Sequence, residues 1–186
     1  MTNSLFFLVH TLADLFLTLL LLRFLFQYLR VDFYNPISQI IYKTTAPVTT
    51  RAQRLFYFLP IEVVCLALLL VFQLLYIWLM QQLYISAGLM LENESLINLI
   101  FLAVKRTLNE ALWIFTLSIF FQALFSWFGN AYNSPMGRLF NEMNEPLLRP
   151  IRKYLPNAAG LDFSSLIVLI LLNTIRAGVT LPTYLM

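Results

Sequence analysis

Long runs of apolar residues restrict the folds open to this chain more than any other feature. The first covers residues 5–29 and the second residues 61–84. The third has its membrane part at residues 107–128, and the fourth covers residues 164–181. Because a helix rises about 1.5 Å per residue, about 20 residues cross a hydrocarbon core of about 30 Å. The runs therefore predict an all-α membrane protein with four transmembrane helices.

The composition excludes several other classes of protein. Hydrophobic residues make up 60% of the chain and charged residues 11%, whereas soluble domains average about 45–50% and 25%. A net charge of +3 is too small to predict nucleic-acid binding. With a single cysteine, Cys65, and a single histidine, His10, we expect no disulfide framework, no metal or other cofactor, and no enzymatic activity.

The basic residues indicate how the spans are oriented. Eight of the twelve lysines and arginines lie in two long connections, residues 30–60 and 129–163. The positive-inside rule then places both connections in the cytoplasm and both termini outside. The short connection with Glu92 and Glu94 would also lie outside, and residues 96–104 would lie partly along the outer surface.

The chain also repeats itself with an offset of about 99 residues. Phe16 matches Phe115 under this offset. We therefore predict two tandem units, residues 1–90 and 91–186. Each has the form helix, amphipathic segment, helix, and the two run in parallel. Parallel repeats occur in some transporters, although gene duplication alone also produces them.

Each long connection contains signals for a short helix. Asn35 precedes Pro36, and Ser134 precedes Pro135. Asparagine and serine are common at a helix N-cap, and proline is common at the first residue of a helix. Later prolines, at positions 47 and 146, are expected to end these helices.

The second connection has an amphipathic, basic character. Its candidate binding residues share a positive charge; they are Arg138, Arg149, Arg152 and Lys153. Cations in the headgroup layer attract anionic lipid, by about 1 kcal/mol each. The segment is expected to bind anionic lipid or a protein partner. Alternatively, it only packs on the helix bundle and closes a loop.

These connections resemble those of the YggT (YlmG) family over nearly the whole chain. Residues 32–39 (DFYNPISQ) are similar to the opening motif of the repeat, residues 144–153 (NEPLLRPIRK) to its central motif, and residues 160–164 (GLDFS) to its closing motif. The first copy lacks the paired cations and the closing motif. The resemblance implies a multi-pass protein of the bacterial inner membrane, linked to osmotic or envelope stress, with an accessory rather than enzymatic role.

Charged residues inside the predicted spans form a second candidate site. Its members are polar residues of three spans: His10, Asp14, Glu110, Asn173 and Arg176. Asp14 and Arg176 lie at similar depths, about 13 Å and about 12 Å below the outer surface. We therefore expect an ion pair between them, because intramembrane charges usually have partners.

Two interpretations of this cluster remain open. It is either a structural ion pair or the centre of a small potassium or proton transporter or channel subunit. A conducting pore would need a homo-oligomer, because four helices offer few internal polar groups. One turn separates Arg106 from Glu110, so these two residues could pair with each other.

Overall fold

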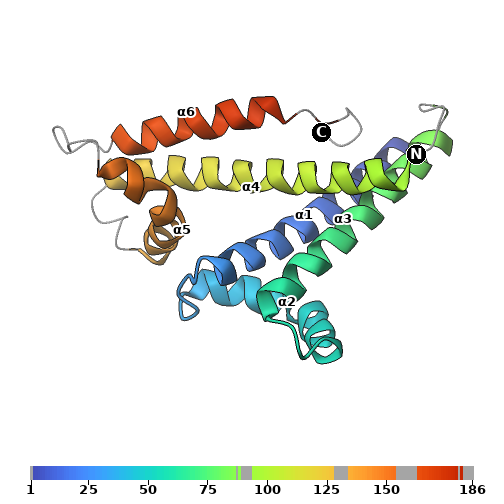
Figure 1. The fold of residues 1–186 in the computed structure, drawn as a ribbon, viewed down its shortest axis with the longest axis horizontal. Helices are drawn as coiled ribbons and strands as arrows, with labels where there is room; N and C mark the ends of the chain where they lie inside the picture. The colour runs from blue at the N-terminus through green and yellow to red at the C-terminus, as the bar shows by residue number, and fades with distance from the viewer. Residues whose placement is uncertain are drawn as a thin grey trace. The chain divides into compact units, whose positions relative to one another are not determined.

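The computed structural model describes residues 2–86, 88, 94–127, 134–153, 163–179 and 181. Within these residues the chain is helical, without strands. Figure 1 shows the helices in chain order, which are α1 (Thr2–Tyr28), α2 (Pro36–Leu55), α3 (Ile61–Ser86), α4 (Leu96–Trp127), α5 (Pro135–Arg152) and α6 (Phe163–Gly178). The predicted all-α class is therefore confirmed.

Three helices are long and apolar enough to cross a membrane, namely α1, α3 and α4. The described part of α6 has 16 residues, which corresponds to about 24 Å, less than a hydrocarbon core of about 30 Å. The chain thus has the composition of a multi-pass membrane protein. Residues 96–104, expected partly along the outer surface, form the first turns of the continuous helix α4.

The chain forms two compact units, and each combines parts of both sequence repeats. Unit 1 contains residues 1–24, 44–108 and 181–186, and unit 2 contains residues 25–43 and 109–180. Because the boundary falls between Lys43 and Thr44, helix α2 contributes to both units.

Unit 1 is built on the packing of α1 against α3. The Phe16 and Phe72 rings meet edge to face with their centroids 5.2 Å apart. Fully buried leucines and isoleucines extend this contact; they include Leu20 on α1 and Leu69 and Ile77 on α3. Burial of such side chains contributes about 1.5–3 kcal/mol each.

Unit 2 has its own apolar core, formed by α4, α5 and α6. Its buried members are Leu112, Ile119, Leu148, Val168 and Leu172. Leu148 is completely buried, so α5 is held against the apolar helices by its inner face.

Both predicted helix starts are confirmed. Asn35 Oδ1 accepts a hydrogen bond from the Ile37 N–H at 3.0 Å, and α2 begins at Pro36. Ser134 Oγ accepts from the Gly137 N–H at 3.1 Å, and α5 begins at Pro135. In each case the cap provides an acceptor for a backbone N–H that has no partner inside the helix.

The predicted helix ends are wrong, because both prolines lie inside their helices. Pro47 is within α2, and α5 continues past Pro146 to Arg152. A proline inside a helix costs about 3 kcal/mol. Tertiary packing offsets this cost in α5, where Asn144 and Leu148, on either side of Pro146, are both fully buried.

Candidate functional site

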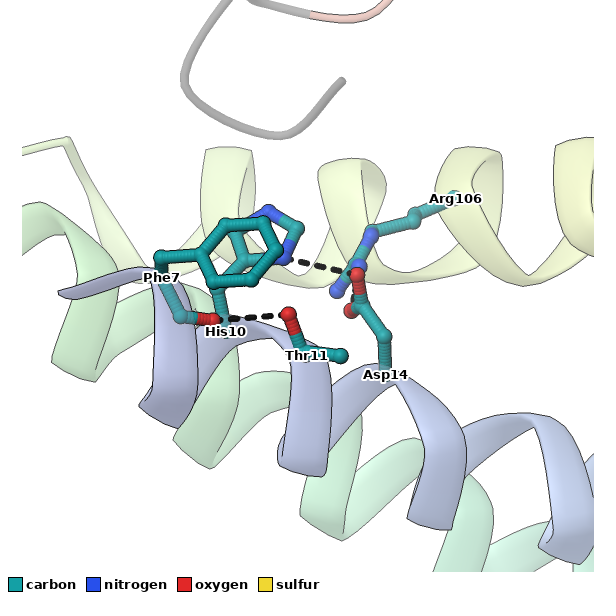
Figure 2. Close-up of polar contacts among 5 residues, drawn as sticks. All are labelled: Phe7, His10, Thr11, Asp14 and Arg106. Atoms are coloured by element: carbon teal, nitrogen blue, oxygen red, sulfur yellow. Dashed lines mark hydrogen bonds and ion pairs between the residues drawn. The ribbon is translucent and has the colours of Figure 1, made fainter. Parts of the chain in front are cut away.

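A polar cluster in unit 1 is centred on Asp14 of α1. Its Oδ2 lies 2.8 Å from His10 Nδ1, one helical turn earlier. Its Oδ1 accepts a hydrogen bond from Arg106 Nη2 of α4. Figure 2 shows His10 and Arg106 converging on the Asp14 carboxylate. The cluster therefore connects α1 to α4.

Tyr76 extends this cluster to α3. The Arg106 guanidinium carbon lies 4.0 Å from the centroid of the Tyr76 ring, and the His10 ring meets the same ring edge to face. Arg106 is only 5% exposed, whereas Asp14 and His10 are 33% exposed. A buried arginine is stable here because its charge faces both a carboxylate and an aromatic ring.

The structure corrects the predicted partner of Asp14, which is Arg106 and not Arg176. The third span was expected to begin at residue 107, which placed Arg106 at its edge, so Arg106 was not considered as a partner of Asp14. Arg106 lies ten residues into α4, about 15 Å along the helix, which is close to the depth of Asp14. Pairing of Arg106 with Glu110 on its own helix was the simpler expectation, so the longer-range partner was missed.

The other predicted cluster residues belong to unit 2. Arg176 Nε donates to Asn109 Oδ1 at 3.1 Å, and its guanidinium lies 4.5 Å from the centroid of the Trp113 ring. Asn173 is exposed and donates to the carbonyl of Leu169 on its own helix. Glu110 is half-buried on α4. Each unit thus has its own arginine stacked on an aromatic ring.

A second polar network, missed by the sequence analysis, joins α4 to α5. Asn144 is completely buried. Its Oδ1 accepts from Ser118 Oγ at 2.7 Å, and its Nδ2 donates to Gln122 Oε1 at 2.8 Å. Gln122 Nε2 in turn donates to Asn141 Oδ1 at 3.0 Å. These bonds hold the inner face of α5 against α4.

The first repeat has a related junction at equivalent positions. The offset of about 99 residues aligns Arg23 with Gln122 and Thr45 with Asn144. Arg23 Nη1 donates to Thr45 Oγ1 at 2.9 Å, and both side chains are buried. The recurrence of polar residues at these aligned positions was the signal that could have revealed both junctions.

The outward face of α5 contains the predicted basic residues. Arg138, Arg149 and Lys153 are exposed. Arg152 is half-buried, and its Nη1 lies 3.1 Å from Glu145 Oε2. This ion pair partly neutralises the basic surface, which leaves Arg138, Arg149 and Lys153 as its exposed cations.

These features define a class of protein, a multi-pass helical membrane protein with two repeated segments. The profile of the CCB3/YggT family matches residues 2–83 and 101–183. The chain belongs to this family.

Bacterial relatives cover almost the whole chain. The uncharacterized protein YggT of Escherichia coli (strain K12) is 32% identical over 179 residues, which span 95% of this chain and 89% of the relative. The uncharacterized protein PA0392 of Pseudomonas aeruginosa is 30% identical over 190 residues, with coverage of 96% and 93%. A Vibrio alginolyticus relative is 32% identical over 172 residues, with coverage of 90% and 89%. No solved structure matches the chain.

Gln73 on α3 leads to a first stability prediction. Its side chain is completely buried, and neither amide atom has a hydrogen-bond partner within the described residues. Leucine has a similar size and removes the cost of burying these atoms. We expect Gln73→Leu to stabilise the protein by about 1–3 kcal/mol, measured by thermal unfolding in detergent. Destabilisation would show that the amide is hydrogen-bonded in the folded protein.

Proposed function

We propose that this chain is a non-enzymatic accessory or scaffold protein of the bacterial inner membrane, active in osmotic or envelope-stress physiology. In this proposal α5 is an amphipathic helix in the headgroup layer, where it binds anionic lipid or a protein partner. The observation that supports it is the contrast between the two faces of α5. Arg149 and Lys153 are exposed, while Asn144 is buried and hydrogen-bonded to α4. A helix held in this way can present its cations in a constant orientation.

The proposed topology has four spans, with both long connections in the cytoplasm and both termini outside. Helices α1, α3 and α4 would each cross the membrane. The apolar helix α6 would form the fourth span together with the residues that follow it. The placement of α5 beside the cytoplasmic headgroups then follows from the positive-inside rule.

Charge reversal on α5 tests the lipid-binding role. We expect Arg149→Glu with Lys153→Glu to lower retention of phosphatidylglycerol by the purified protein by about fivefold or more for each position, since a cation near an anionic surface contributes about 1 kcal/mol. Lipid retained after detergent exchange is the measurement.

A matched control comes from the same helix. Arg152→Gln should have a smaller effect, because Arg152 already pairs with Glu145. Unchanged retention in the double variant, with α-helical content intact, would leave a protein partner as the only occupant of this surface. It would contradict lipid binding by α5.

Ion transport is the alternative that the intramembrane polar cluster suggests. Pairing of Asp14 with Arg106 compensates both charges, which favours a structural role for the cluster. The proposal therefore expects no ion flux from the protein in proteoliposomes. Flux that disappears in Asp14→Asn would contradict it and would identify the cluster as a transport site.

A further inference from the structure

The segment that joins α2 to α3 presents large apolar side chains to the outside of unit 1. Leu55 is 75% exposed and Tyr57 is 83% exposed, and the flanking Phe56 and Phe58 are also exposed. A cluster of exposed aromatic residues usually marks an interaction surface. These side chains therefore need an explanation beyond the packing of unit 1.

This segment is an ordered turn. The Phe56 N–H donates to the Ala52 carbonyl and the Leu59 N–H to the Phe56 carbonyl, both at 3.0 Å. Gln53 Nε2 donates to the Leu59 carbonyl at 3.1 Å. The ring of Phe58 also meets the ring of Tyr57 edge to face, with a centroid separation of 6.0 Å. The backbone thus holds the rings in an exposed position.

The position of the turn points to a bilayer as its surroundings. The candidate span of α3 begins at Ile61, four residues after Tyr57. Even a fully extended chain of four residues reaches at most about 13–14 Å, so the turn lies close to the boundary between the hydrocarbon core and the headgroups. Aromatic side chains are enriched at this boundary, where an apolar ring and a polar hydroxyl are both accommodated.

The charge around the turn favours an anionic surface. Arg51 and Arg54 are exposed at the end of α2. Helix α2 contains no aspartate or glutamate, and within the described residues neither arginine forms an ion pair. On α5, by contrast, Glu145 pairs with Arg152. The first repeat therefore has the less neutralised basic surface, although its motif departs more from the family pattern.

We propose that residues 51–58, the aromatic–arginine segment, anchor unit 1 in the bilayer surface and bind anionic phospholipid. The rings of Phe56, Tyr57 and Phe58 enter the boundary between headgroups and acyl chains. Arg51 and Arg54 bind the phosphate groups of the lipids above them. This inference does not depend on the function proposed for α5, because it concerns different residues of the other repeat.

Depth measurements by electron paramagnetic resonance test the position of the rings. A nitroxide is attached at Tyr57→Cys in full-length Cys65→Ser protein, reconstituted in vesicles of phosphatidylglycerol and phosphatidylcholine. We expect collisions with oxygen to exceed those with a water-soluble nickel complex. A label at Glu94→Cys is the matched control, because Glu94 is exposed and lies two residues before α4. This control label should prefer the nickel complex, and a Tyr57 label with the same preference would overturn the proposal.

The arginines are tested separately, with the native cysteine in place. We expect Arg51→Gln and Arg54→Gln each to weaken association of spin-labelled phosphatidylglycerol by about fivefold, the equivalent of about 1 kcal/mol per cation. Association of spin-labelled phosphatidylcholine should not change. Unaltered selectivity in the double variant would overturn the proposal.

The two lipid-binding proposals can fail independently. Arg149→Gln with Lys153→Gln is the comparison, because it removes two exposed cations at the C-terminal end of α5. Loss of selectivity only in this α5 variant would overturn the role of Arg51 and Arg54 and leave the α5 proposal intact. The reverse result would support the aromatic–arginine segment and contradict lipid binding by α5.

Discussion

Replacing Asp14 by leucine is expected to destabilise the protein by about 3–5 kcal/mol, because it leaves the buried Arg106 charge without its carboxylate. Arg106 is 5% exposed, so water cannot replace the lost carboxylate. The variant would keep the contact between the Arg106 guanidinium and the Tyr76 ring, and such a cation–π contact contributes about 0.5–2 kcal/mol. Chemical unfolding of the purified protein in detergent micelles, followed by circular dichroism, measures the change.

A double variant separates the buried charge from other effects. Asp14→Leu with Arg106→Leu removes both charges, and we expect it to recover most of the lost stability. His10→Ala is the matched control on the same carboxylate, with an expected effect below about 1 kcal/mol, since both groups are 33% exposed. A double variant no more stable than Asp14→Leu would contradict the pairing of Asp14 with Arg106.

The second large effect is expected at Asn144. Its replacement by leucine removes the donor to Gln122 Oε1 and one of the two acceptors of Ser118 Oγ, which also donates to the Phe115 carbonyl. The unsatisfied Gln122 oxygen costs about 1–3 kcal/mol and the lost bond of Ser118 about 0.5–1.5 kcal/mol, so we expect a total loss of about 2–4 kcal/mol. Thermal unfolding in detergent is the measurement, and increased proteolysis within α5 should accompany it.

Asn141 provides the control for this junction. It accepts a hydrogen bond from Gln122 Nε2, and it is only half-buried. Asn141→Ala should therefore cost about 1 kcal/mol. Equal effects at Asn141 and Asn144 would show that the buried pair of bonds is not what fixes α5.

Much of the fold follows from local patterns in the sequence. The apolar runs predict α1 and α3 within a few residues, and the pairs Asn35–Pro36 and Ser134–Pro135 predict where α2 and α5 begin. These features depend on residues close together in the chain. The ends of α2 and α5 could not be predicted in this way, because packing of residues beyond the prolines decides where these helices end.

The candidate site was harder to predict for a related reason. His10 and Asp14 were recognised as polar residues inside a predicted span, and their spacing of four residues places them on one helix face. The partner of Asp14 depends on which arginine reaches it, and the predicted span of residues 107–128 left Arg106 at the membrane edge. In the structure α4 begins at Leu96, so Arg106 lies further along the helix, where it pairs with Asp14 of α1.

The hydrogen bonds of the turn before α2 also constrain the order in which the chain can fold during its synthesis. The backbone N–H of Asp32 donates to Glu142 Oε2 at 2.8 Å, and Asn35 Nδ2 donates to the Pro135 carbonyl at 2.7 Å. Asp32 and Glu142 are 110 residues apart, so a ribosome adding about 5–20 residues per second needs roughly 5–20 s to supply the missing acceptor. During that interval the Asp32 N–H and the Asn35 amide lack these two acceptors. The turn before α2 can therefore form these hydrogen bonds only after residues of α5 have been synthesised.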